Sequence, residues 1–307
     1  MADSIFVASL TTVAGQVPDT SEGDMLRFLR GFNWQKSEAH LVLLSRFVSP
    51  RAPADVMAPK HWKALLGEPP EQAIKRFLDE GMLSSPGNPV RGAAVGTAVF
   101  QCSSDGHRIV SQYLATAKAQ RLAAEQEVLA LLVRGQLREA SKRMASYEAE
   151  QLIPRDSGVD WNQYSPVRDM LILTSIFGGT PKVLARLSQS KMEPLRLAVG
   201  MMHLWGADSP SAWLPTGFDT GSDIDSETAA HMLHYYAAQQ AALVQYRQMG
   251  FVKAVRIEPR NDSSTCEACR RLASMTFRLD EVPDLPYEGC TSAHGCRCST
   301  VTVADEP

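Results

Sequence analysis

The chain has 307 residues, enough for two or three folded units, and its apolar and charged contents of 44% and 21% are those of an ordinary globular protein. Its formal net charge of −3 excludes the strongly basic composition of most nucleic-acid-binding proteins. The first residues lack a positive segment followed by an apolar run, and no stretch approaches about 18 consecutive apolar residues, so we expect no secretory signal, no membrane span and a cytoplasmic location.

The N-terminal region, residues 1–88, is predicted to form a small helical unit. An apolar pattern at 25–29 indicates a first helix. A second helix begins at Ser37, and the run Ser-Pro-Arg-Ala-Pro at 49–53 ends it, because proline lacks a backbone donor and fixes its own φ. The stretch Ser-Ser-Pro-Gly-Asn-Pro at 84–89 is typical of a linker and places the end of this unit at residue 88.

Within this region, two short helices are predicted at 61–66 and 73–78, and Gly81 is suited to end the second one. The pair faintly resembles SAP-type and winged-helix DNA-binding modules. The resemblance implies contact with DNA, but the pair supplies few cations, namely Lys60, Lys63, Lys75 and Arg76. Nucleic-acid binding is therefore expected to be weak.

Residues 96–250 are predicted to form a helical body, because apolar residues recur there at helical spacing. The predicted helices cover 107–134, 137–152, 167–177, 181–187, 192–205 and 226–249. His231 and His234 share one face of the last helix, but without a neighbouring carboxylate a metal role is not predicted for them. Cys102, far from the other cysteines in sequence, is predicted to be an ordinary buried thiol.

Residues 251–307 are predicted to form a small β-containing zinc module of treble-clef or ribbon-like type. The alternation from Phe251 to Ile257 indicates a strand, with partners at 277–279 and 300–303. The module has few large apolar residues, so metal ligation is expected to supply much of its stability. The predicted fold class is therefore mainly α, a helical body with this small module at the C-terminal end.

Five of the six cysteines fall between residues 266 and 298, in the patterns Cys-x2-Cys, a single cysteine, and Cys-Arg-Cys. A structural Zn²⁺ ion needs four sulfur or nitrogen ligands, usually as two close pairs. We predict one zinc ion per chain, with Cys266 and Cys269 as the first pair. The other two ligands are two of Cys290, Cys296 and Cys298, with His294 as a competing ligand.

Two other uses of these cysteines remain open, a disulfide cluster and a redox pair. An odd number of cysteines and the absence of a secretory signal argue against disulfides. A catalytic zinc site would need an open coordination position and a general base, and the sequence contains no H-E-x-x-H pattern. We therefore favour a closed structural site.

The same segment resembles the C-terminal end of Mu-type phage head-morphogenesis (minor head) proteins. The resemblance covers about 60 residues and rests on Asp262, Cys266-x2-Cys269, the run 277–280, the Pro-Asp-Leu-Pro run 283–286 and the Cys-Arg-Cys run 296–298. Residues 290–295 stand where that family has a short His-Pro-Asn run. The resemblance implies a zinc-bearing fold and a role in head assembly.

Three classes of function compete on these observations. We rank first a non-enzymatic, zinc-binding adaptor or scaffold that acts through a protein partner, because the sequence shows no catalytic motif of a known class. A phage or prophage-derived head-morphogenesis protein ranks second. A DNA-acting enzyme such as a nuclease ranks third, since the sequence shows no pair of carboxylates or histidines at the spacing typical of a catalytic metal site.

Overall fold

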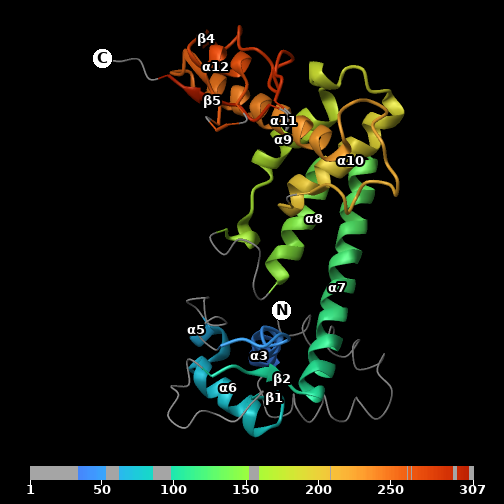
Figure 1. Cartoon of the computed structure of the whole chain (residues 1–307), viewed down its shortest axis with the longest axis vertical. Helices are drawn as coiled ribbons and strands as arrows, with labels where there is room; N and C mark the ends of the chain where they lie inside the picture. The colour runs from blue at the N-terminus through green and yellow to red at the C-terminus, as the bar shows by residue number, and fades with distance from the viewer. Residues whose placement is uncertain are drawn as a thin grey trace. The chain divides into compact units, whose positions relative to one another are not determined.

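The structure is a computed structural model that describes residues 34–52, 62–85, 98–151, 159–207, 209–260, 262–263, 265–292 and 296–303. Contacts divide the chain into two compact units. The first comprises Met1–Leu122 with Glu150–Pro154, and the second comprises Ala123–Ala149 with Arg155–Pro307. The described part is mainly helical with a small sheet near its C-terminal end, which confirms the predicted fold class (Figure 1).

The described residues of the first unit form three short helices, a two-stranded ribbon and the start of a long helix. These elements are α3 (Trp34–Ser45), α5 (Trp62–Leu66), α6 (Pro70–Asp79), β1 (Leu83–Ser84), β2 (Gln101–Cys102) and the first turns of α7 (Ser104–Val133). Pro70 begins α6, where a missing backbone N–H costs nothing, and the chain leaves α6 through Gly81 at φ +71°. The predicted helix at 25–29 and Lys60 lie outside the described residues.

The core of this unit extends beyond the predicted linker. Leu83 of β1 pairs with Cys102 of β2, and Ile109 and Val110 of α7 are buried in the same apolar cluster as Phe77. The grouping by contacts therefore places the start of α7 with the N-terminal helices, whereas the sequence pattern placed a boundary at 88–96. The predicted domains 1–88, 96–250 and 251–307 stay predictions.

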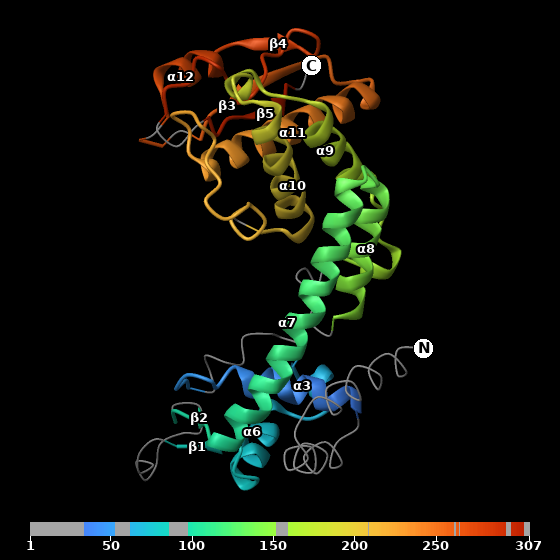
Figure 2. The same cartoon turned by 90° about the vertical axis from the view of Figure 1, so that its right-hand side faces the viewer.

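The second unit is built around the helices α8 (Leu137–Glu150), α9 (Val167–Gly178), α10 (Gln189–Trp205) and α11 (Ser226–Met249), with short 3-10 turns at η2 (Trp161–Gln163) and η3 (Lys182–Leu184). In Figures 1 and 2, α9, α10 and α11 lie side by side. Asp225 begins α11 by accepting a hydrogen bond from the Thr228 N–H at 2.9 Å, and Gly250 ends it at φ +71°. Among the described residues, no helix combines the length and apolar character that a bilayer crossing requires.

A small antiparallel sheet follows α11 and carries the helix α12 (Glu267–Ala273). Its central strand is β3 (Ala254–Glu258), flanked by β4 (Thr276–Arg278) and β5 (Ser299–Thr302). Val255 pairs with Phe277 on one side and with Thr302 on the other. Val255 and Ile257 are buried while Arg256 and Glu258 are exposed, so the strand alternation predicted from the sequence is confirmed.

Candidate metal centre

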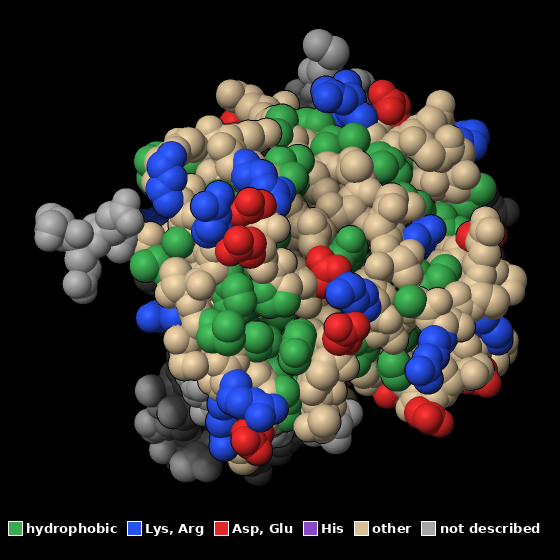
Figure 3. Space-filling view, turned by 90° about the horizontal axis from the view of Figure 1, so that it is seen from above, with side chains coloured by type: hydrophobic (Ala, Val, Ile, Leu, Met, Phe, Trp, Pro, Cys, Tyr) green, Lys and Arg blue, Asp and Glu red, His purple; other side chains and the backbone are tan. Residues whose placement is uncertain are grey.

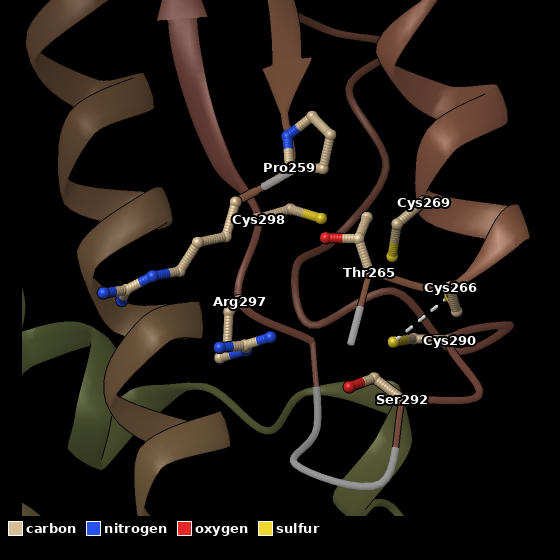
Figure 4. A pocket seen from close by; sticks show the side chains of 9 residues that line it. Pro259, Thr265, Cys266, Cys269, Cys290, Ser292, Arg297 and Cys298 are labelled. Carbon is tan, nitrogen blue, oxygen red and sulfur yellow. Dashed lines mark hydrogen bonds between the residues drawn. The ribbon is translucent and has the colours of Figure 1, made fainter. Parts of the chain in front are cut away.

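Five cysteines reach one end of the small sheet from three separate segments. Cys266 precedes the first residue of α12, and Cys269 lies in the first turn of that helix. Cys290 belongs to the loop that follows β4, while Cys296 and Cys298 lie directly before β5. Figure 4 shows the sulfur atoms of Cys266, Cys269 and Cys290 pointing toward one another, with Cys298 facing them from the opposite side.

The distances between these sulfur atoms fit metal ligation. Cys266 Sγ lies 3.7 Å from Cys290 Sγ, and Cys269 Sγ lies 3.8 Å from Cys296 Sγ. A Zn–S bond of about 2.3 Å in a tetrahedron places neighbouring sulfur atoms about 3.8 Å apart. A disulfide would need about 2.05 Å, and all six cysteines are free.

The sulfur atoms form two overlapping groups. Those of Cys266, Cys269 and Cys290 all lie within 4.8 Å of one another, as do those of Cys269, Cys296 and Cys298. Cys269 therefore belongs to both groups. Four of the cysteines, Cys266, Cys269, Cys290 and Cys298, also line one pocket. Cys296 is 2% exposed and does not line it.

Hydrogen bonds fix the two segments that bring the first and last cysteines together. Arg297 Nη2 donates to Asp262 Oδ1 at 2.9 Å, which ties the Cys-Arg-Cys run to the turn before α12. In that turn, the Thr265 N–H donates to the Asp262 carbonyl at 3.1 Å. Ser292 Oγ lines the same pocket and is buried with no hydrogen-bond partner among the described residues.

The thiols influence one another's ionisation. Burial opposes ionisation of Cys266, but the backbone N–H groups of Cys269 and Thr291 lower its pKa to about 6. A hydrogen bond from Cys298 lowers the pKa of Cys296 to about 5. The result is two groups that are anionic at neutral pH.

The other three thiols are held in the neutral form. Burial raises the pKa of Cys290 to about 11, and burial together with the nearby Cys296 thiolate raises the pKa of Cys269. The pKa of Cys298 is raised first by its hydrogen bond to Cys296 and then by burial. Like charges this close cannot all form without a cation, and a divalent metal ion between the sulfur atoms removes that repulsion.

The core of the module consists to a large extent of the cysteines themselves. The buried cluster around the site consists of Ile257, Cys269, Leu272, Leu285, Cys296 and Cys298, and Val252 and Val255 are the other buried aliphatic side chains described in the module. Phe251, which the alternating pattern included in the first strand, is instead 74% exposed. A core with so few aliphatic side chains supplies little stability by itself, which is the usual situation in small metal-dependent modules.

The structure brings together all five cysteines that the sequence singled out. His294 lies outside the described residues. Cys102 belongs to the first unit, where it is 4% exposed and its thiol donates to the Leu44 carbonyl at 3.3 Å, so it is the ordinary buried thiol that was predicted. Sequence reasoning missed the pairing of Arg297 with Asp262, although both residues belong to the motif that carries the phage resemblance.

In comparisons with protein-family models, curated proteins and solved structures, nothing matches this chain. The site is therefore interpreted from its own geometry. A cluster of five cysteines that can hold a metal ion is the chemical feature that distinguishes the C-terminal end.

Proposed function

We propose that this protein is a non-enzymatic, cytoplasmic adaptor whose C-terminal module is held together by one structural zinc ion. One observation carries the proposal: thiols from three segments converge with sulfur–sulfur distances of 3.7 and 3.8 Å, close to those of a tetrahedral zinc–thiolate site. A reducing compartment is implied because the thiols must stay free to bind the metal.

Zinc is the metal that best suits this set of ligands. Soft thiolates select zinc, copper(I) or iron–sulfur clusters, whereas calcium and magnesium require oxygen ligands. The pair Cys266 and Cys269 at the start of a helix, joined to a distant Cys-Arg-Cys run, matches the two-pair arrangement of structural zinc modules. The thiolates already favoured at Cys266 and Cys296 would give an arriving zinc ion its first ligands.

We assign the four ligands as Cys266, Cys269, Cys290 and Cys296, because Cys266 Sγ lies 3.7 Å from Cys290 Sγ and Cys269 Sγ lies 3.8 Å from Cys296 Sγ. Cys298 is then the spare thiol, although it lines the same pocket. Four thiolates fill the tetrahedron and leave no open position for a substrate or an activated water, so the ion has a structural role.

Protein binding is the role that we assign to the module. Met249 and Phe251, at the junction between α11 and the sheet, are 51% and 74% exposed. Aromatic residues and methionine are enriched in protein interfaces, so these side chains are the anchors that we propose for a partner. A pull-down in which Phe251→Ser captures the same proteins as the wild type would contradict this assignment.

A second candidate is a head-morphogenesis role in a phage or prophage. The ion pair between Asp262 and Arg297 favours it, because both ends of the motif that resembles the Mu-type family meet at one point. The test is co-expression with the portal protein encoded by a neighbouring gene. Co-purification that depends on the C-terminal module would support this candidate, and a genome position without any head or portal gene would count against it.

Elemental analysis of the purified chain and its cysteine variants tests the proposal. The wild type and Cys102→Ser are expected to contain one zinc per chain, since Cys102 lies in the other unit. Cys266→Ser and Cys296→Ser are expected to lose the metal. Cys298→Ser is expected to keep it. Zinc that survives in Cys296→Ser but not in Cys298→Ser would overturn the ligand assignment, and a wild type without metal would overturn the proposal itself.

A further inference from the structure

A line of polar side chains runs through the helical core of the second unit, remote in sequence from the cysteines. Asp169 on α9 is 6% exposed. Its Oδ2 accepts hydrogen bonds from Ser141 Oγ of α8 at 2.7 Å and from the Tyr164 hydroxyl at 2.5 Å. Its Oδ1 lies 3.1 Å from Nε2 of His203 on α10. These contacts satisfy the buried carboxylate and orient the imidazole of His203.

A second imidazole faces the other side of His203. Nε2 of His234, on α11, lies 3.3 Å from Nδ1 of His203, and the ring centroids are 5.5 Å apart. Because the Asp169 carboxylate accepts a hydrogen bond from Nε2–H of His203, the ring lone pair lies on Nδ1, which faces His234.

We propose that His203 Nδ1 and His234 Nε2 form a second metal site, which binds one divalent transition-metal ion such as Co²⁺ or Ni²⁺. Two metal–nitrogen bonds of about 2.0–2.1 Å, the length of a Zn–N bond, place the nitrogen atoms about 3.3–3.4 Å apart at the tetrahedral angle. The observed separation is 3.3 Å. When the ion binds, His234 carries its proton on Nδ1. The lone pair of Nε2 then faces the ion.

Asp169 has the position of an outer-sphere partner. Metal-binding histidines almost always donate their other ring N–H to a carboxylate, a backbone carbonyl or water, and loss of that partner typically weakens metal affinity 10–100-fold. Two imidazoles leave the remaining coordination positions of the ion to water. Imidazoles also differ from thiolates in the metals that they prefer, so the two sites can fill separately.

The test is a Co²⁺ titration of the purified full-length chain whose cysteine site already holds one zinc. We expect one further equivalent of Co²⁺ to bind, with visible d–d absorption and without the near-ultraviolet charge-transfer band that thiolate ligands produce. His234→Gln is expected to weaken this binding at least tenfold, and Asp169→Asn by about 10–100-fold. The control is His107→Gln, on α7, which is expected to bind Co²⁺ as the wild type does.

Three results would overturn the proposal. One is a wild type that binds no second equivalent, because the rings would then be a hydrogen-bonded pair and nothing more. Another is binding that is unchanged in both His234→Gln and Asp169→Asn. The third is a thiolate charge-transfer band, which would assign the Co²⁺ to the cysteines. Far-ultraviolet circular dichroism shows whether each variant is folded. If His234→Gln does not fold, the Co²⁺ affinity of Asp169→Asn decides whether the proposal holds.

Discussion

Gln239 and Leu285 are joined by a short hydrogen bond between the helical part of the second unit and its C-terminal module. The Oε1 atom of Gln239, on α11, accepts from the Leu285 N–H at 2.7 Å, and its Nε2 atom donates to the Pro283 carbonyl at 2.9 Å. Gln239 is 5% exposed and Leu285 is 1% exposed. A single amide side chain thus satisfies two polar backbone groups of the buried loop that leads to Cys290.

Two other side chains of α11 strengthen this junction. Arg247 Nη2 donates to the Leu279 carbonyl at 2.9 Å, and the Tyr246 hydroxyl donates to the Thr300 carbonyl at 3.3 Å. These contacts fix the module against α11, while α11 itself also packs on α9 and α10.

The first prediction concerns Gln239→Ala. The change leaves the buried Leu285 N–H and Pro283 carbonyl without their partner, so we expect the free energy of unfolding to fall by about 1–3 kcal/mol. Urea denaturation followed by circular dichroism measures it. The matched control is Gln240→Ala, whose side chain makes a longer contact of 3.4 Å with Asp284 and is expected to change stability by less than about 0.5 kcal/mol. Equal effects of the two changes would contradict this account of the junction.

The second prediction concerns loss of the metal. Cys266→Ser is expected to release zinc and expose the chain after Gly250 to protease, because Ile257, Leu272 and Leu285 are the main aliphatic side chains left in its core. Most helical residues precede Gly250, so far-ultraviolet ellipticity is expected to change little. A cooperative loss of the whole helical signal would show that the module and the helices of the second unit fold only together.

The third prediction concerns pH. Burial and the neighbouring His203 and His231 lower the pKa of His234 from 6.5 to about 4. At a pH between 4 and 6.5, His234 is protonated in the unfolded chain but not in the folded chain. The contribution of His234 to the free energy of unfolding is therefore complete above pH 6.5 and is lost as the pH falls toward 4. The loss amounts to about 3 kcal/mol.

The measurement is the unfolding free energy of the wild type and of His234→Gln across that pH range, without added metal. The zinc ligands also titrate there, but they are the same in both proteins, so the difference between the two curves isolates His234. The variant is expected to show the shallower slope. Parallel curves would mean that His234 takes up its proton without cost in the folded chain.

The fourth prediction concerns DNA. Arg76 of α6 is paired with Glu68, which leaves the pair of short helices with little free positive charge for phosphates. On the face drawn in Figure 3, Lys and Arg side chains are interspersed with Asp and Glu. We expect weak binding that disappears as salt rises, because affinity of this kind follows counterion release. Fluorescence anisotropy with a labelled duplex measures it, and nanomolar binding at physiological salt would contradict the prediction.

Local patterns predicted most helices of the described residues and the strands β3, β4 and β5. They did not predict α12 or the ribbon of β1 and β2, and the helix predicted at 181–187 is only the 3-10 turn η3. Gly135 and Gly250, both at positive φ, follow the helices that the sequence predicted to end there. The alternation of apolar residues in β3 and the grouping of five cysteines likewise identified the sheet and the candidate site. Each of these signals lies within a few residues of chain, where backbone conformation and side-chain direction are set locally.

Contacts between distant residues could not be predicted in the same way. Ile109 and Val110 mark a buried helix face, but the pattern does not say which core they enter, so the boundary at 88–96 was placed from the linker-like composition alone. From the sequence alone, Gln239 is expected to be a solvent-exposed polar residue of a helix. The structure places the loop at Leu285 against it. His203 and Asp169 lie 34 positions apart, which is why no carboxylate was expected near His234.

The most direct test of the zinc assignment is X-ray absorption at the zinc edge of the purified wild-type chain. The account predicts a first shell of four sulfur atoms at about 2.3 Å and one zinc per chain. If no zinc is present and native mass spectrometry finds the cysteines linked as disulfides, or if the first shell consists of nitrogen and oxygen, then the cysteine cluster is not the structural zinc site proposed for it.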